Sequence, residues 1–377
     1  MTTELAGRAA ELAALAELVR TLRRGGRIGV VEGEAGIGKT RLLEAAGELA
    51  RAAGVTVLAG RGEELEARRP FGPLVDCVGR ERLERHLGDW EVRPDAAAER
   101  QFSVAETVLE RLDELSVRGP VLLVVEDLHW ADPATLAVLA RVAAGIAALP
   151  AGLLVSLRPQ PRGAALDALL GALAERGARI VRLGPLDAAA TAELVAGLIG
   201  VPPGARLALQ AGRAAGNPLF ICELVAGLQA AGAIRDGELA TTGPVPALPL
   251  TILHRLSFLA RDALDLLGLA AVLGASFDAA DLALLAGRPL TELLGPLRTA
   301  RRAGVIVARD ERLAFRHELV RDALYEDVPL SVRRGLHVQA AAALTAASRP
   351  PESVAEHVLR SARPGDERAV AALSATA

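Results

Sequence analysis

The chain has 377 residues and a formal net charge of −3, with 51% hydrophobic but only 2% aromatic residues. This length predicts two or three domains, and the scarcity of aromatic residues means that their cores are built mainly from Leu, Val and Ala. The charge balance gives no basic footprint, so it argues against nucleic-acid binding by this chain itself.

The chain opens with an amphipathic helical pattern that runs to about Arg24. Acidic residues within this pattern rule out a signal peptide. Gly7 and Arg8 stand at the entry of the helix, and on physical grounds alone they fit an ordinary helix start.

A glycine-rich turn between a strand at 27–32 and a helix at 40–53 follows. It fits the pattern G-x-x-x-x-G-K-[ST], in which main-chain N–H groups and the positive end of the helix dipole face one spot. We expect ATP or ADP to bind there, with Lys39 on the β- and γ-phosphate oxygens and the Thr40 hydroxyl on Mg²⁺. The predicted nucleotide-binding residues of this turn are Gly33, Glu34, Ala35, Gly36, Ile37, Gly38, Lys39, Thr40 and Arg41.

Lys39 is the only lysine in the chain, and every other basic residue counted with it is an arginine. Asn217 is likewise the only asparagine, a bias typical of GC-rich coding. A lysine that remains under such a bias indicates a site that needs a compact, flexible ammonium rather than a planar guanidinium. The alternative interpretation is an ordinary glycine turn with a solvated lysine.

A continuous apolar strand that ends in two carboxylates is predicted at 120–127. All-apolar strands are typical of a sheet that is covered on both faces. In phosphate-loop proteins an acid at this strand end holds Mg²⁺, and a neighbouring acid orients the attacking water. We therefore assign Glu126 to the metal, together with Thr40, and Asp127 to the role of base. Taken alone, two acids after a strand also fit the start of a loop.

The next elements complete an α/β domain. Residues 129–133 form a turn in which Asp132 is the N-cap of a helix at 134–148. The strand at 152–157 leads into Arg158, which could sense a γ-phosphate because strand ends face the ligand crevice; a surface arginine is the alternative. Strands at 55–59 and 178–183 and helices at 74–87, 96–115, 164–176 and from 187 predict a parallel sheet within a nucleotide-binding domain at 1–184.

Nothing in the sequence points to a membrane or to secretion. The longest uncharged apolar run, between Arg141 and Arg158, is broken by a proline and a glycine, so it is not a membrane span. Cys77 and Cys222 lie far apart within apolar patterns, which is typical of free thiols in a reducing cytosol. We expect a cytoplasmic protein that does not contact a membrane.

From about residue 202 the pattern becomes helical. A proline-rich linker at 242–249 separates a small helical domain at 185–242 from helices and a short β-hairpin that suggest a winged helix at 250–330. A helical region at 331–377 reads as the start of a truncated repeat domain. The predicted helices are 203–214, 219–230, 251–259, 261–273, 278–285, 290–303, 318–325, 331–346 and 351–359, and the predicted hairpins are 233–242 and 305–315.

The chain resembles the AAA-like ATPase core of STAND-class signalling NTPases, and in particular the large ATP-binding LuxR-type (LAL) transcriptional regulators. The segments EDLHWADP and GNPLF are more specific for this family than the phosphate loop alone. The matching segments are LAGR at 5–8, GEAGIGKTRLL at 33–43, VLLVVEDLHWADP at 121–133, LVSLRP at 154–159, GNPLFICEL at 216–224 and FRHELVRDALY at 315–325.

The resemblance implies an AAA-like nucleotide domain, a small helical domain, a winged helix, helical repeats and a DNA-binding helix-turn-helix that lies outside this chain. It places Gly7 and Arg8 near the base and ribose, and it places Pro218 against the adenine. It also implies that Arg158 reports the γ-phosphate and that His317 locks an ADP-bound closed state. For His317 a helix-start residue is the alternative.

One departure from the family concerns hydrolysis. The family usually has Asp where this chain has Glu126, and a shorter Asp127 stands at the position of the base. We therefore expect a weak ATPase that serves as a slow ATP/ADP switch and self-associates in the ATP state. The alternatives are a motor ATPase, the nucleotide module of a sensory cyclase or kinase, and a degenerate, non-hydrolysing interaction scaffold.

Overall fold

The protein is described by a computed structural model covering residues 5–63, 70–87, 97–159, 162–240, 253, 256 and 259–362. The chain divides into two compact units, Met1–Pro185 and Leu186–Ala377, called here the first and the second unit. The predicted linker at 242–249 and most of the predicted helix at 251–259 lie outside the described residues.

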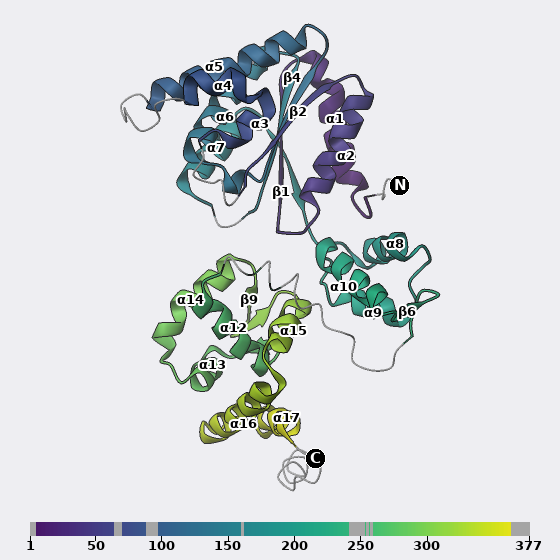
Figure 1. Cartoon of the computed structure of the whole chain (residues 1–377), viewed down its shortest axis with the longest axis vertical. Coiled ribbons are helices and arrows are strands. Elements are labelled where there is room, and N and C mark those ends of the chain that lie inside the picture. Colours follow the sequence, from purple (N-terminus) through teal and green to yellow (C-terminus); the bar gives the residue numbers. More distant parts are fainter. Residues whose placement is uncertain are drawn as a thin grey trace. The chain divides into compact units, whose positions relative to one another are not determined.

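A parallel sheet forms the centre of the first unit (Figure 1). Within the described residues it has five strands in the order β2-β3-β4-β1-β5, and every neighbouring pair is parallel. The strands are β1 (Arg27–Gly33), β2 (Thr56–Arg61), β3 (Val121–Glu126), β4 (Ala151–Leu157) and β5 (Arg179–Leu183). The predicted α/β fold with a parallel sheet is confirmed.

Helices cover both faces of this sheet (Figure 1). Alternate strand residues point to opposite faces, so each strand feeds two separate cores. On one face Val31, Val124 and Leu154 pack with the helices α1 (Ala9–Thr21) and α2 (Lys39–Ala52). The core on the other face includes Val30 and Val155. It packs with α3 (Gly72–Val78), α5 (Ala97–Ser116), α6 (Pro133–Gly145) and α7 (Ala164–Glu175).

The predicted helix at 74–87 is wrong as a single element. The structure has two helices there, α3 and α4 (Arg80–Leu87), which are separated at Gly79. Gly79 has a φ of +91°, a conformation that glycine adopts readily and that ends a helix.

The sheet brings together the segments predicted to bind nucleotide. Because the strands are parallel, their carboxyl ends meet at one edge, where ligands bind in open α/β sheets. The register pairs Glu32 of β1 with Leu157 of β4, and Val125 of β3 with Val155 of β4. The phosphate loop, the two acids and Arg158 therefore follow neighbouring strand ends.

The second unit is mainly helical. Its helices are α8 (Ala188–Ile199), α9 (Ala205–Gly212), α10 (Pro218–Ala230), α12 (Arg261–Leu273), α13 (Ala279–Ala286), α14 (Leu290–Arg302), α15 (Glu318–Asp327), α16 (Leu330–Ala346) and α17 (Pro351–Ser361). Its strands are β6 (Ile234–Arg235), β7 (Glu238–Leu239), β8 (Ser276–Phe277), β9 (Ile306–Arg309) and β10 (Arg312–Phe315). The predicted hairpins are β6–β7 and β9–β10, and β8 adds an unpredicted third strand to the second of them, in the order β8-β10-β9.

Candidate functional site

The phosphate loop joins the end of β1 to the start of α2. Gly36 and Gly38 have φ angles of +74° and +102°, a conformation that side chains rarely allow. The side chain of Ile37 between them is only 2% exposed and packs in the core beneath α1 and α2. The loop is therefore anchored by one apolar residue while its glycines turn the backbone toward the helix N-terminus, as an anion site requires.

Lys39, the first residue of α2, lies folded across this loop. Its Nζ donates hydrogen bonds to the carbonyl oxygens of Gly33, at 3.0 Å, and Glu34, at 2.9 Å. The side chain is 7% exposed. Burial, together with the charges of Arg158 and Arg61, lowers the pKa of Lys39 to about 8, although the nearby carboxylates of Asp127 and Glu126 oppose the shift.

Thr40 and Glu126, the two residues assigned to Mg²⁺, lie next to each other. Burial raises the pKa of the Glu126 carboxyl, although the neighbouring Thr40 hydroxyl and the charge of Arg61 act in the opposite direction. Among the described residues, Oε2 of Glu126 is buried and has no hydrogen-bond partner. A hydroxyl beside a buried carboxylate oxygen is a donor set that fits Mg²⁺, which takes few protein ligands and keeps waters and phosphate oxygens for the rest.

No group of three or more His, Cys, Asp or Glu that could hold a metal is found in the described part of the chain.

Asp127 has a left-handed backbone, with a φ of +53°. Its N–H donates to Oγ of the fully buried Ser156, at 3.1 Å, which ties the turn after β3 to strand β4. The side chain is held by Arg61, whose Nε and Nη2 donate to the same Oδ2 at 3.1 and 2.9 Å. The candidate base is thus already engaged in an ion pair.

Arg61 is a candidate site residue that no sequence pattern indicated. It is the last residue of β2 and pairs in register with Glu126. Besides binding Asp127, its Nη2 donates to Oγ1 of Thr40 at 3.2 Å. The guanidinium therefore bridges the hydroxyl assigned to Mg²⁺ and the carboxylate assigned to the attacking water.

Arg158 follows the end of β4 and lies over Trp130, with 5.5 Å between its Cζ and the ring centroid. His129, next to that tryptophan, is buried, and its ring nitrogens have no hydrogen-bond partner among the described residues. Burial, and then the charge of Arg158, lowers the pKa of His129 to about 3. Arg158 thus lies close enough to influence both His129 and Lys39, and its role as a γ-phosphate sensor stays a prediction.

Arg8 is 6% exposed and lies against the phosphate loop. Its Nη2 donates to the carbonyl oxygens of Ile37, at 3.3 Å, and Gly184, at 2.6 Å, and its Nη1 pairs with Glu11 at 3.1 Å. Gly7 before it has a φ of +64°. The structure therefore brings Gly7 and Arg8 to the loop, and their predicted contact with base and ribose stays a prediction.

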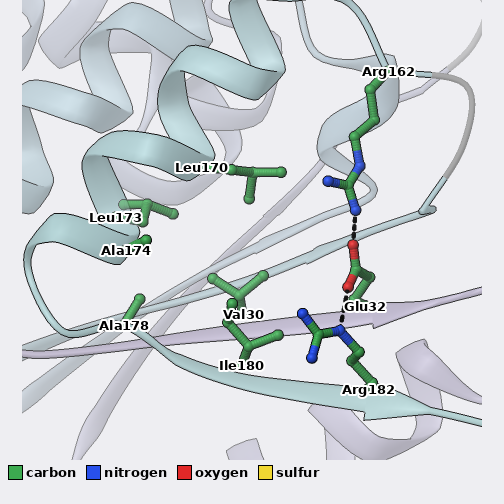
Figure 2. A pocket seen from close by; sticks show the side chains of 9 residues that line it. All are labelled: Val30, Glu32, Arg162, Leu170, Leu173, Ala174, Ala178, Ile180 and Arg182. Atoms are coloured by element: carbon green, nitrogen blue, oxygen red, sulfur yellow. Dashed lines mark hydrogen bonds and ion pairs between the residues drawn. The ribbon is translucent and has the colours of Figure 1, made fainter.

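A separate pocket of about 110 Å³ lies on the α7 side of the sheet (Figure 2). Figure 2 shows Glu32, one of the residues that line it, between Arg162 and Arg182. Glu32 forms ion pairs with both arginines, and Nε of Arg182 lies 3.1 Å from its Oε2. None of the residues predicted to bind nucleotide lines this pocket.

Residues 4–156 match the family described as the AAA ATPase domain. The matched range contains the phosphate loop, Arg61 and both acids. An AAA ATPase domain therefore occupies most of the first unit. No curated protein matches the chain.

Solved structures match the chain at low sequence identity, and those with a TM-score of 0.50 or more show the shared fold. The Walker-type ATPase PABY2304 of Pyrococcus abyssi is 15% identical, with a TM-score of 0.55 over 85% of this chain and 96% of that chain. The ORC2 protein of Aeropyrum pernix, in its ADPNP–ADP complexes, is 16% identical, with a TM-score of 0.50 over 92% of this chain and 95% of that chain. A STAND protein with a tetratricopeptide repeat sensor from Pyrococcus horikoshii is also similar, at 16% identity and a TM-score of 0.34 over 92% and 47% of the two chains.

Pro218 and His317 lie outside the matched AAA ATPase domain, in the second unit. Asn217 caps helix α10 by accepting a hydrogen bond from the Leu219 N–H at 3.1 Å, and Pro218 is the first residue of that helix. Phe220 lies two residues after Pro218 in α10. The His317 ring meets the Phe220 ring edge-on, with 4.8 Å between the two centroids. Burial lowers the pKa of His317 to about 4. The two predicted nucleotide contacts of this unit are thus brought close to one another.

No helix in the described ranges is both long enough and apolar enough to cross a membrane.

The pKa of Lys39 predicts how nucleotide affinity of the AAA ATPase domain depends on pH. Without nucleotide the ammonium deprotonates at about pH 8. Phosphate oxygens favour the protonated form, so binding takes up a proton above that pH but not below it. We expect the Kd for ATP, measured by titration calorimetry, to rise about twofold from pH 7 to 8 and then by up to about tenfold per pH unit. A Kd unchanged up to pH 9.5 would contradict a role for this ammonium.

Proposed function

We propose that the chain is an ATP-binding signalling ATPase that acts as a slow ATP/ADP switch. We further propose that it belongs to a LuxR-type transcriptional regulator of the STAND class, whose DNA-binding part lies outside this chain. The observation that carries the proposal is the buried Lys39 ammonium, which lies across a glycine-rich loop beside two acids and Thr40.

The chemical groups in the site support the binding of a nucleotide together with Mg²⁺. A buried ammonium, a helix N-terminus and main-chain amides suit a polyphosphate, and Thr40 with Glu126 suits the cation. The related fold of the Aeropyrum pernix protein was determined in ADPNP–ADP complexes. We propose the same ligand class here, with Gly33–Arg41 cradling the phosphates and Arg158 facing the γ-phosphate.

Slow turnover is supported by the state of the two acids. Asp127 has to leave its ion pair with Arg61 before it can orient a water. Glu126 stands where the family usually has the shorter Asp, and its pKa is raised by burial. The ion pair adds a rearrangement before hydrolysis, and the raised pKa disfavours the ionised Glu126 carboxylate; both suit a switch more than a motor.

We propose a regulatory role for the second unit. In this proposal it consists of a small helical domain at 185–242, a winged helix at 250–330 and a helical region from 331. The winged helix is supported by helices α12, α13 and α14 with the sheet β8-β10-β9. Arg213, which follows α9, forms ion pairs with Glu318 and Asp322 of α15, and the His317 ring before α15 contacts the Phe220 ring of α10. In this proposal His317 and Pro218 contact ADP in a closed state, and ATP releases them and permits self-association.

The segments EDLHWADP at 126–133 and GNPLF at 216–220 support the assignment to the LuxR-type family and hence a cytoplasmic regulator. DNA would then be contacted only through a domain beyond this chain.

Steady-state hydrolysis of Mg-ATP by the 377-residue chain tests the switch. We expect fewer than about 1 turnover per second, against the values of about 1 to 1,000 per second that are typical of enzymes. A sustained rate well above that limit would favour a motor or an attached catalytic module. Failure of both ATP and ADP to raise the melting temperature would favour the non-hydrolysing scaffold.

A further inference from the structure

Three side chains of the second unit form a hydrogen-bonded chain that joins three helices. Oη of Tyr325 on α15 lies 2.9 Å from Nε2 of His337 on α16. Nδ1 of His337 lies 2.8 Å from Nδ1 of His357 on α17. His337 is 1% exposed and His357 is 4% exposed, and Tyr325 is the only tyrosine in the sequence.

Two neutral rings are compatible with this hydrogen-bonded chain. In the arrangement that keeps both rings neutral, the tyrosine hydroxyl donates to Nε2 of His337. Nδ1 of His337 then carries a proton and donates it to Nδ1 of His357. In this order both imidazoles are neutral, and every bond in the chain has one donor and one acceptor.

The surroundings oppose a positive charge on either ring. The guanidinium carbons of Arg321, Arg333 and Arg360 lie 4.7, 4.8 and 5.7 Å from the centroid of the Tyr325 ring. Burial lowers the pKa of His337 to about 4, and His357 and the three arginines add to this shift.

The pKa of His357 is lowered in the same way, first by burial and then by Arg360. Glu356 on α17 and Asp281 on α13 act in the opposite direction but do not reverse the shift. The side chains that surround the pair from α13, α15, α16 and α17 therefore favour two neutral rings.

We propose that the Tyr325–His337–His357 chain is an acid-labile clasp that fastens the helical hairpin α16–α17 to α15. One added proton can be shared within the histidine pair, but it places a charge in a buried site beside three guanidinium groups. A second proton removes the remaining acceptor nitrogen, so the bond between the two rings is lost. Opening of the clasp is therefore coupled to proton uptake.

The direction of the pH effect follows from the two lowered pKa values. A histidine in the opened hairpin titrates near its ordinary value of about 6.5, whereas in the closed clasp it resists protonation to a lower pH. The closed form is thus fully favoured above the ordinary value and loses stability as the pH falls through the window below it. Because α15 also carries Glu318 and Asp322, which hold Arg213, the clasp and this ion-pair contact act on the same helix. The clasp does not depend on nucleotide binding.

Hydrogen–deuterium exchange of the whole chain between pH 7.5 and 5.0, corrected for the intrinsic pH dependence of exchange, tests the proposal. We expect the opening constant of α16 and α17 to rise below about pH 6.5 by about tenfold per pH unit for each histidine that takes up a proton. Helix α8, which contains no histidine, is the internal control and should show no such increase. Equal pH responses of α8 and of α16–α17 would overturn the proposal.

Two sets of variants separate the clasp from a merely structural contact. His337→Gln and His357→Gln each remove one titrating group, so the steepness of the pH response should fall. Tyr325→Phe removes one hydrogen bond but no histidine, so opening should increase at every pH while the steepness is unchanged. If a histidine variant does not fold, the pH response of exchange in the unaltered chain still tests the proposal. A histidine variant that folds and keeps the full steepness of the pH response rules the clasp out.

Discussion

Lys39→Ala is expected to abolish detectable nucleotide binding, with a loss of affinity of about 100-fold or more. A hydrogen bond from an ammonium to a charged oxygen is worth about 1.5–3 kcal/mol, and in the proposed complex Lys39 contacts several phosphate oxygens at once. ATP at about 100 times its Kd should stabilise the unaltered chain by about 2.7 kcal/mol. A thermal melt with and without Mg-ATP should show this shift in the unaltered chain and none in the variant.

The melting temperature without ligand provides the first control. Lys39 is a buried ammonium with a pKa lowered to about 8, so its charge costs stability in the absence of phosphate. Removing it should not lower the ligand-free melting temperature, and loss of the ATP shift then cannot be attributed to unfolding. Arg51→Ala, an exposed change in the last turn of the same helix, should keep the full shift. An ATP shift that survives Lys39→Ala would contradict the assignment of the site.

Asp127→Asn is expected to reduce ATP turnover by about 100-fold or more while leaving the Kd for ATP within about threefold. The amide has the same shape as the carboxylate but cannot accept a proton from the attacking water. Single-turnover hydrolysis at saturating Mg-ATP measures the chemical step directly. Turnover equal to that of the unaltered chain would exclude Asp127 as the base.

Arg61→Gln is the matched variant for which we expect the opposite effect to that of Asp127→Asn. Arg61 engages both Asp127 and Thr40, and its side chain is 50% exposed, so this ion pair is worth no more than about 1 kcal/mol. Releasing both partners should raise turnover or tighten Mg-ATP binding by up to about fivefold. If turnover and the affinity for Mg-ATP both fell, this would show instead that Arg61 itself binds the nucleotide.

Local signals explain why much of the first unit could be predicted. The apolar strand that ends at Glu126, and the glycine pattern before Lys39, depend only on residues that are near one another in sequence. Once the parallel sheet is inferred, the strand ends at Gly33, Glu126 and Leu157 must meet at one edge.

The unpredicted features depend on contacts between distant segments. Arg61 reaches Asp127 because β2 lies beside β3 in the sheet, and the order of strands is not encoded in any local pattern. The strand β8 has only two residues and pairs with β10, which follows it much later in the chain. A segment this short shows no recognisable periodicity of hydrophobic residues. The contact between His337 and His357 likewise requires knowledge of how α16 and α17 pack.

The most direct test of nucleotide binding at the phosphate loop uses the fact that Lys39 is the only lysine in the chain. An acyl-phosphate derivative of ATP transfers its acyl group to an amine that lies beside the bound phosphates, forming an amide as ATP departs. The neutral amine is the form that reacts, and burial, which lowers the pKa of Lys39 to about 8 without nucleotide, makes this form more accessible than in an ordinary lysine. We expect mass spectrometry to find the acyl group on Lys39, and excess ATP or ADP to suppress it. Absence of the label, or labelling that neither nucleotide suppresses, would contradict the account.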